Sequence, residues 1–352
     1  MKILHVDTAA GWRGGQNQVL LTARGMAARG HQVTLACRGD GILEDSARSA
    51  GLDVHAFPFR GDWSPSATLG LARLARRDPP DVVHAHDPHA LAAVLVVGAP
   101  RVGSRRVDFA LQGRASRWKY SRCERIIAVS DAVAAVLRRD GVAPDRVRVV
   151  YEGVPDRRPE PGGRAMLESL GVPMTALVVG SVAALADHKD HKTLLSAAAE
   201  VTARVPAAHF VIVGDGERKA DLHAQAAALG LQGRVFFTGF RQDLDRLIPA
   251  FDVFCLSSKM EGLGTSLLDA MCFARPVVAT AAGGIPEAVE DGVTGRVVPV
   301  QDPAALAAAL VAVLLDRSER ERLGTAGRRR FEARFSADRM VDATLAVYGE
   351  LR

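Results

Sequence analysis

The sequence has few aromatic residues, few cysteines and no long apolar stretch. Aromatic residues make up 5% of the 352 residues, and no zinc-finger or RNP-like spacing occurs, so we expect no nucleic-acid partner. The four cysteines, at positions 37, 123, 255 and 272, form no CxxC pair, which is typical of buried free thiols in a reducing cytosol. No window of about 18 uncharged apolar residues occurs. The opening MKILHVDTAAGWRGG predicts a strand rather than a signal peptide. These absences predict a cytoplasmic protein, with peripheral contact at the inner face as the one possible membrane contact.

The composition is otherwise that of a globular protein large enough for two domains. Hydrophobic residues make up 48% and charged residues 24% of the chain, which is ordinary for soluble proteins. A chain of 352 residues exceeds the usual size of one core. The net charge of +5 suits an anionic ligand or an anionic membrane surface.

Short apolar runs alternate with longer helical patterns rich in alanine, leucine and arginine along the whole chain. This alternation is typical of parallel sheets with crossover helices on both faces. The sequence therefore predicts an α/β protein with two doubly wound, Rossmann-like sheets. The expected strands form two series: residues 3–6, 33–36, 54–57, 82–85, 126–129 and 147–150, then 176–181, 209–213, 235–237, 253–256, 277–280 and 296–298.

A proline- and glycine-rich stretch over residues 152–171 separates the two series and is typical of a linker. Two doubly wound sheets joined in this way are expected to leave a cleft between their strand ends, where such folds bind ligands. The last residues show partly helical spacing of apolar side chains. We therefore expect a first domain over 1–155, a linker over 156–172, a second domain over 173–335, and a C-terminal helix over 336–352 that packs back across the linker.

Residues 251–295 contain the most informative pattern of the chain. An apolar run is followed by Glu261, by Gly262-Leu263-Gly264, and by a helical segment that contains Asp269. Carboxylates accept hydrogen bonds from sugar hydroxyls, and unpaired N–H groups at a helix N-terminus attract phosphate. If the span were all helical, Glu261 and Asp269 would lie ~12 Å apart along the axis and could hold separate parts of one ligand. The combination suits a nucleotide-sugar.

Other glycine-containing strand ends extend this candidate binding surface. Gly14-Gly15 follow the first strand and precede a helix, where glycine permits close approach of a phosphate, although a simple tight turn explains the pattern equally well. Lys189, after the first strand of the second half, is placed to meet a diphosphate as a point charge. Gly214 closes a further strand, and the backbone at Phe240-Arg241 is a candidate for contact with a base.

Two patterns are compatible with a metal site, but a different role is favoured for each. His84 and His86 alternate along the fourth strand and share a face, but the sequence offers no third ligand. His86 is therefore a candidate for contact with substrate. Asp243 and Asp245 form a DxD pattern inside a helical segment, where capping and surface exposure explain it better. We expect no metal and no cofactor. Ser130 and Asp190 each precede a helical segment and are expected to be helix N-caps.

Residues 101–125 form a strongly basic segment. It contains eight arginines and lysines but two acidic residues, and Trp118 and Tyr120 lie among them. An anionic acceptor or an anionic bilayer would be attracted there, and each basic group near lipid is worth ~1 kcal/mol. A solvated basic loop is the alternative. Arg106 and Lys119 are the candidates for the acceptor side.

These motifs together resemble family 4 of the GT-B glycosyltransferases, the retaining nucleotide-sugar transferases. The resemblance covers essentially the whole chain. It is carried by GWRGGQNQVLLTARGMAARGHQVTLAC, DVVHAHDPHAL, LVVGSVAALADHKDHKTLL, HFVIVGDGE, VFFTGFRQDL and, most specifically, EGLGTSLLDAMCFARPVVATAAGGIPEAVEDGVTG. It implies a GT-B architecture, with the donor held mainly by the C-terminal domain and the acceptor by the N-terminal domain.

The resemblance also implies roles for individual residues. Glu261 matches the first acid of the E-x7-E motif and would contact the transferred sugar, and Asp269 matches the second acid and would bind the ribose. The backbone at Leu263, Gly264 and Thr265 would meet the diphosphate or the sugar. The other matches are Lys189 with the phosphate-binding lysine, Gly15 with the glycine near the phosphates, and His86 with the histidine near the sugar.

Two positions depart from the family pattern. The second acid is Asp269 rather than glutamate, which shortens it by one methylene. The family often has an arginine at the position where this chain has Ser181, so one cation on the diphosphate is missing or comes from elsewhere. The resemblance names neither the sugar, the base nor the acceptor.

The sequence thus predicts a retaining, metal-independent glycosyltransferase. It would move a sugar from a nucleotide-sugar to a hydroxyl of a glycan, a lipid-linked acceptor or a small molecule, with Lys189, Glu261 and His86 as catalytic candidates. Surface-glycan, lipopolysaccharide or glycolipid synthesis is the expected setting. A nucleotide-sugar epimerase of the same fold and a non-catalytic nucleotide-sugar-binding subunit remain as alternatives. The sequence leaves the oligomeric state open.

Overall fold

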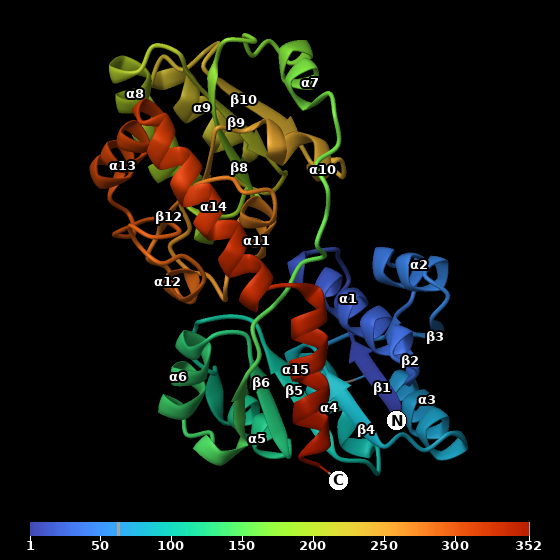
Figure 1. Cartoon of the computed structure of the whole chain (residues 1–352). Coiled ribbons are helices and arrows are strands. Elements are labelled where there is room, and N and C mark those ends of the chain that lie inside the picture. Colours follow the sequence, from blue (N-terminus) through green and yellow to red (C-terminus); the bar gives the residue numbers. More distant parts are fainter. Residues whose placement is uncertain (62–63, 352) are drawn as a thin grey trace. The chain divides into compact units, whose positions relative to one another are not determined.

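The protein forms two compact units. The computed structural model describes residues 1–61 and 64–351. The first unit comprises Met1–Gly153 together with Ala337–Arg352, and the second comprises Val154–Ser336. Each unit is built on one sheet with its own helices (Figure 1).

The first unit contains a seven-stranded parallel sheet with the strand order β3-β2-β1-β4-β5-β6-β7. The order reverses next to β1, and parallel sheets of this kind place their ligand sites at the carboxyl ends of the strands at such a point. The strands are β1 (Lys2–Asp7), β2 (Gln32–Arg38), β3 (Asp53–Phe57), β4 (Val82–Ala85), β5 (Arg101–Arg105), β6 (Arg125–Ala128) and β7 (Val147–Val149).

Helices cover both faces of this sheet, because its strands carry apolar side chains on both faces. Ile3, Val82 and Val102 pack with residues of α1 and α15 on one face, whereas Leu4 and Val83 pack in the cluster that covers the other face. The helical segments are α1 (Gly14–Ala28), α2 (Ile42–Ser49), α3 (Pro65–Arg77), α4 (Pro88–Ala93), η1 (Val94–Val96), α5 (Gly113–Ser121), α6 (Asp131–Arg139), η2 (Pro144–Arg146) and α15 (Ala337–Gly349).

The second unit repeats the topology with a six-stranded parallel sheet in the order β10-β9-β8-β11-β12-β13. The order again reverses next to its first strand, β8. The strands are β8 (Leu177–Val182), β9 (Ala208–Val213), β10 (Val235–Gly239), β11 (Val253–Leu256), β12 (Val277–Thr280) and β13 (Gly295–Val298).

Apolar side chains from both strands and helices form the core of the second unit. Val179, Phe210 and Val253 pack in a cluster with Leu194 of α8 and Leu310 of α13. The helical segments are α7 (Gly163–Ser169), η3 (Asp187–Lys189), α8 (His191–Arg204), α9 (Lys219–Ala228), α10 (Leu244–Leu247), η4 (Ile248–Ala250), α11 (Thr265–Cys272), α12 (Ile285–Ala288), α13 (Pro303–Leu315) and α14 (Arg317–Arg334).

The predicted α/β fold with two parallel sheets is confirmed, and each of the twelve predicted strands overlaps a strand of the structure. One further strand, β5, is absent from the prediction. Its sequence RVGSR has no continuous apolar run and instead indicates the start of an exposed basic segment. The strand nevertheless lies between β4 and β6, and four of its five residues are buried.

One segment near the boundary between the units differs from the sequence-based expectation. Residues 156–172, expected to be a linker, belong to the second unit and contain the helix α7. The final helix, α15, belongs to the first unit although its residues come last in the chain, in line with the expected C-terminal helix that packs back (Figure 1). Met340, Val341 and Tyr348 of α15 are buried against the sheet of the first unit, which explains the apolar spacing of the C-terminal segment.

The four cysteines are free and buried, as expected. Burial raises the pKa of Cys255 to about 12, so this thiol stays protonated at neutral pH. Among the described residues, no helix has the length and apolar character needed to span a bilayer.

Candidate functional site

The candidate donor site lies at the carboxyl ends of β8 and β11 in the second unit. Lys189, on η3 after β8, forms an ion pair with Glu261 after β11, with Nζ 2.5 Å from Oε2. The hydroxyl of Ser258 donates to the same carboxylate oxygen at 3.1 Å. The side chains of Lys189 and Glu261 are 19% and 12% exposed. The structure therefore brings two of the predicted catalytic residues into direct contact.

Backbone contacts between the two loops hold this ion pair in place. Ser257 donates its hydroxyl to the carbonyl oxygens of Lys189 and Asp190, at 3.1 and 3.0 Å. The backbone N–H of Lys259 donates to the carbonyl of His188 at 2.9 Å. Asp190 also caps α8 by accepting from the N–H of Thr193, as predicted. The lysine and the glutamate are therefore presented from a cross-linked pair of loops rather than from flexible ones.

Glycine is required where these loops approach one another most closely. Gly214 has a φ of 143°, and a Cβ at this position would lie 2.0 Å from the carbonyl oxygen of Ala183. Gly264 has a φ of 89°, and its Cβ would lie 3.4 Å from Cγ of Glu261. Residues other than glycine are disfavoured at both positions, because of the left-handed backbone conformation and because a Cβ would lie too close to neighbouring atoms.

The N-terminus of α11 faces the same loop. Gly264 is the residue before the helix and Thr265 is its first residue. The first N–H groups of a helix have no partner within the helix and favour an anion. Leu263, predicted to act through its backbone, buries its side chain completely and anchors the loop that contains Gly262. This arrangement places backbone donors next to a lysine and a carboxylate.

Asp269, the second predicted acid, is held by a residue for which the sequence gives no local signal. Arg157 donates from Nη2 to Oδ1 of Asp269 and from Nη1 to Oδ1 of Asp245, the latter at 2.6 Å. The side chain of Asp269 is 13% exposed. Burial raises the pKa of Asp269 to about 6 and the charge of Asp245 adds to the rise, whereas Arg157 acts in the opposite direction.

The other predicted donor-binding residues vary in their surroundings. Ser181 on β8 is buried, and its hydroxyl has no hydrogen-bond partner among the described residues. Phe240, after β10, exposes 62% of its surface and could stack on a flat ring. Arg241 forms an ion pair with Asp243, with Nη2 2.6 Å from Oδ2. Asp243 and Asp245 are thus both paired with arginines, and neither acts as a side-chain helix cap.

Two surface hollows of the second unit, of about 380 and 630 Å³, are lined by other residues than Lys189 and Glu261. The candidate site is therefore defined here by its side-chain chemistry and its place on the sheet.

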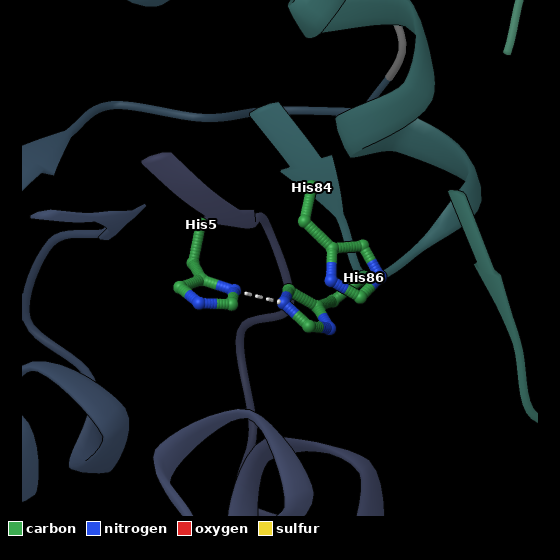
Figure 2. Close-up of side chains that lie close together, drawn as sticks. All are labelled: His5, His84 and His86. Carbon is green, nitrogen blue, oxygen red and sulfur yellow. Dashed lines mark hydrogen bonds between the residues drawn. The ribbon is translucent and has the colours of Figure 1, made fainter. Parts of the chain in front are cut away.

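In the first unit, three histidines lie together at the carboxyl ends of β1 and β4. His5 pairs directly with His84 in the parallel register of the two strands, and His86 follows two residues later. All three rings therefore lie on one face of the sheet, and Figure 2 shows the ring of His86 beside both others. The alternation along β4 correctly predicts that His84 and His86 share a face. It gives no sign of His5, because the register between two strands cannot be read from either strand alone.

Hydrogen bonds fix the protonation of His86 and His5. Nη2 of Arg106 lies 3.2 Å from Nδ1 of His86, and a guanidinium can only donate, so Nδ1 accepts. The ring proton of neutral His86 is then on Nε2, which donates to Nδ1 of His5 at 2.7 Å (Figure 2). The nitrogens of His84 contact the hydroxyls of Tyr348 and Ser104, at 2.6 and 2.8 Å.

Burial lowers the pKa of all three histidines, to about 3 for His5 and well below the usual value for His84 and His86. The rings are therefore neutral at physiological pH. A neutral imidazole has one lone pair to offer, and the hydrogen bonds above already engage one in each ring. The positive charge of Arg106 would also repel a cation. The cluster thus fits a set of internally hydrogen-bonded rings better than a metal site, and its bonding leaves no ring nitrogen of His86 directed at a substrate.

Arg106 connects this cluster to the glycine-rich loop. It forms an ion pair with Glu152 at 3.1 Å and donates to the carbonyl of His86 at 3.1 Å. A Cβ on Gly15 would meet Cδ of Arg106 at 3.7 Å, so the start of α1, at Gly14 and Gly15, lies against the arginine. Arg106 is an internal partner of the histidine cluster, with a side chain that is 16% exposed.

The basic segment over residues 101–125 is more structured than expected. Lys119, predicted to face an acceptor, is buried and donates from Nζ to the carbonyl of Pro88 at 2.9 Å. Arg105 is buried and donates to the carbonyl of Phe109 at 2.5 Å. Part of the positive charge of this segment, on Arg105 of β5 and Lys119 of α5, is therefore buried in internal hydrogen bonds. Ser130, by contrast, caps α6 as predicted, accepting from the N–H of Val133.

Comparison with known proteins assigns both halves of the chain. Residues 12–158 match the family described as Glycosyltransferase Family 4, and residues 164–330 match the family described as Glycosyl transferases group 1. The sequence is 31% identical over 307 residues to the lipopolysaccharide core biosynthesis glycosyltransferase LpsE of Rhizobium meliloti, covering 87% of this chain and 84% of that protein.

A second relative gives the same assignment, and a solved structure shows the same fold. The chain is 30% identical to the D-inositol 3-phosphate glycosyltransferase of Stackebrandtia nassauensis, covering 96% of this chain and 87% of that protein. The crystal structure of HepE of Anabaena in complex with UDP-glucose matches the whole of both chains with a TM-score of 0.89 at 24% identity. The two Rossmann-like units are those of the GT-B fold, and the chain belongs to glycosyltransferase family 4, whose C-terminal half is the group 1 domain.

Proposed function

We propose that this protein transfers a sugar from a nucleotide-sugar to a hydroxyl acceptor, with retention of anomeric configuration and without a metal. The observation that carries the proposal is the contact between Lys189 and Glu261 at the carboxyl ends of β8 and β11, next to the N-terminus of α11. This site offers one cation, one carboxylate and unpaired backbone donors. A nucleotide-sugar presents the complementary groups, a diphosphate and a set of hydroxyls.

The donor would exchange the internal ion pair for two contacts of its own. The diphosphate would take the ammonium of Lys189 and the first N–H groups of α11, and the sugar hydroxyls would donate to Glu261. The solved structures of HepE with UDP and with UDP-glucose support a nucleotide-sugar as the donor class. Phe240, with its exposed ring, would then lie where a base could stack.

The chemistry requires no protein nucleophile. The bond between the anomeric carbon and the diphosphate oxygen breaks as the acceptor oxygen forms a bond to the same carbon on the same face. The acceptor proton passes to the departing phosphate oxygen, so the charges balance. Lys189 and the α11 amides stabilise the charge on the leaving group, which is the electrostatic contribution that usually dominates such catalysis. These groups supply the positive charge that a metal would otherwise bring.

We further propose that the acceptor is a glycan, a lipid-linked glycan or a small polyol, and that the protein works in the cytoplasm at an anionic membrane surface. Phe109 and Trp118 expose 46% and 48% of their surface, and Arg105 and Arg122 lie over their rings, which would support contact with lipid. Co-sedimentation with phosphatidylglycerol vesicles should fall for Trp118→Ser and should also fall at high salt. Equal sedimentation with neutral and anionic vesicles would contradict this part of the proposal.

The function is tested first by donor binding and then by turnover. UDP-, GDP- and ADP-linked sugars are screened for thermal stabilisation of the full chain, because a ligand of the folded state raises its apparent stability. The stabilising donor is then incubated with candidate acceptors, and nucleoside diphosphate release and the anomeric configuration of the product are measured by NMR. We expect release that depends on the acceptor, without added metal and unchanged by EDTA.

Three outcomes would contradict the proposal. Conversion of the donor sugar without an acceptor would identify an epimerase. Donor binding without nucleotide release under any acceptor would identify a binding subunit. Inversion at the anomeric carbon would exclude the retaining reaction while leaving the donor site intact.

A further inference from the structure

Arg157 contacts the second acid of the candidate donor site from a distant part of the sequence. It lies in the segment before α7, which was expected to be a linker, and its guanidinium bridges Asp269 of α11 and Asp245 of α10. Its side chain is 26% exposed, and its Cζ lies 5.7 Å from the ring centre of Phe273, one turn beyond Asp269. Two helices of the second unit, α10 and α11, thus converge on one arginine.

We propose that Arg157 is a positioning residue of the donor site, which holds the Asp269 carboxylate ionised and oriented so that it accepts hydrogen bonds from the ribose of the nucleotide. The inference rests on the proposed function, because it assumes that a nucleotide binds beside α11. It assigns to this segment of the chain a part in nucleotide selection that the resemblance to other family members does not supply.

The charges around Asp269 explain why such a residue is needed. A protonated carboxyl has less capacity to accept than a carboxylate, so a strong, charge-assisted hydrogen bond from the ribose requires the ionised form. Burial and the neighbouring charge of Asp245 both favour the protonated form, and Arg157 is the group that opposes them. The resulting pKa of about 6 leaves Asp269 mostly ionised at pH 7. Without Arg157, two carboxylates would face each other with no cation between them.

The geometry leaves room for a ligand on the same carboxylate. The hydrogen bond from Arg157 uses Oδ1 of Asp269, and a carboxylate has a second oxygen, Oδ2, that can accept from a hydroxyl. Asp269 is one methylene shorter than a glutamate and has less freedom to turn. A fixed arginine partner on one oxygen therefore determines where the other oxygen points.

The test measures discrimination between ribose and deoxyribose rather than overall affinity. UDP, GDP and ADP are titrated into the full chain by calorimetry, and the one that binds is compared with its 2′-deoxy and 3′-deoxy analogues. We expect the ribonucleotide to bind about tenfold more tightly than at least one deoxy analogue, in keeping with one hydrogen bond to a charged group. In Arg157→Gln the ribonucleotide should lose about tenfold in affinity, while that deoxy analogue changes less than twofold, so the preference disappears.

The pH profile gives a readout that a purely structural ion pair would not change. In the wild type the preference for ribose should decline as the pH falls through about 6, the pKa of Asp269. Because Arg157 favours the charged form, its removal raises the pKa of Asp269, and any remaining preference in Arg157→Gln should decline at a higher pH. Arg157→Lys keeps the charge and should restore part of the preference.

Arg164→Gln is the matched control. Arg164 lies in α7 and pairs with Asp252 at 2.6 Å, so its loss removes a similar ion pair from the same unit. This variant should keep the ribose preference and its pH midpoint. Equal weakening of ribose and deoxyribose ligands in Arg157→Gln, or an unchanged preference and midpoint, would overturn the inference. Failure of the wild type to bind any of the three nucleotides would instead contradict the proposed donor site itself.

Discussion

The two units share a strand order but hold different groups at the carboxyl ends of their central strands. In the first unit, three buried and neutral histidines lie together at β1 and β4, where His86 bonds His5 and His84 bonds Tyr348 and Ser104. In the second unit, the equivalent ends of β8 and β11 present a charged lysine and glutamate in direct contact. The same scaffold thus holds neutral rings beside an internal Arg106–Glu152 ion pair in the first unit, and a lysine–glutamate pair in the second. We propose that the pair in the second unit is exchanged for the diphosphate and hydroxyls of a donor.

Removal of the lysine should produce the largest functional effect. Lys189→Ala deletes the cation that would stabilise the departing diphosphate, and we expect turnover to fall about 100-fold, as for the loss of one transition-state donor. Nucleoside diphosphate release measures it. Arg204→Ala removes an exposed cation paired with Glu200 on the same unit and should leave turnover within twofold. Equal rates in Lys189→Ala and wild type would show that the charged pair has no part in the chemistry.

Gly214→Ala should destabilise the second unit and leave the first unchanged. The added Cβ would lie 2.0 Å from a backbone oxygen at a φ of 143°, and such strain costs roughly 2–3 kcal/mol. The sequence has no tryptophan after Trp118, so tryptophan fluorescence reports the first unit, while circular dichroism reports both. We expect a shift in the dichroism transition alone.

Gly230→Ala is the control for this change. Gly230 also has a positive φ, of 68°, but a Cβ there would meet nothing within 4 Å. Its cost should be limited to the backbone conformation, roughly 1 kcal/mol. Equal stability of Gly214→Ala and Gly230→Ala would show that the loops after β8 and β9 do not pack as closely as in this structure.

Acid should destabilise the first unit through its neutral histidines. The unfolded chain protonates a histidine near pH 6.5, whereas His5 stays neutral in the fold down to about 3. The unfolded state therefore binds more protons below pH 6.5, and His5 alone should cost about 2 kcal/mol between pH 7 and 5. Asp7, with a pKa raised to about 6 by burial and by Asp87, acts with the opposite sign below pH 6 and offsets part of this loss.

The measurement is the urea midpoint of tryptophan fluorescence between pH 7 and 5. The midpoint should fall with pH in the wild type and fall less steeply in His5→Asn. The same substitution at His55, whose side chain is 41% exposed, should leave the slope unchanged. An identical slope in His5→Asn and wild type would mean that His5 takes up its proton in the folded state as readily as in the unfolded one.

The smallest expected effect comes from the C-terminal helix. Tyr348→Phe leaves Nδ1 of buried His84 without its 2.6 Å partner, and an unsatisfied buried group costs about 1–2 kcal/mol. The tryptophan transition should move by that amount. Tyr151→Phe removes a 3.2 Å hydrogen bond to Asp131 at an exposed position and should change stability by less than about 0.5 kcal/mol. Equal effects of the two substitutions would show that the bond from Tyr348 to His84 stabilises the fold no more than an exposed hydrogen bond does.

The sequence predicts most of the fold because most strands are continuous apolar runs, the pattern of a sheet buried on both faces. It does not predict β5, because arginines border this strand and glycine and serine occupy its centre, and only its neighbours β4 and β6 make it buried. It places Lys189 and Glu261 in one site but cannot give their contact, which depends on how two loops are cross-linked. His5 and Arg157 depend on strand register and on a contact across 112 residues of sequence, and neither leaves a local signal.

The central claim is that the second unit binds the donor through the loops that contain Lys189 and Glu261. Hydrogen exchange of the full chain, with and without the nucleoside diphosphate that stabilises it, tests this most directly. We predict slower exchange over residues 183–190, 214–216 and 258–269, and a loss of that protection in Lys189→Ala. Protection confined to the loops of the first unit, around residues 13–16 and 86–89, would contradict the account.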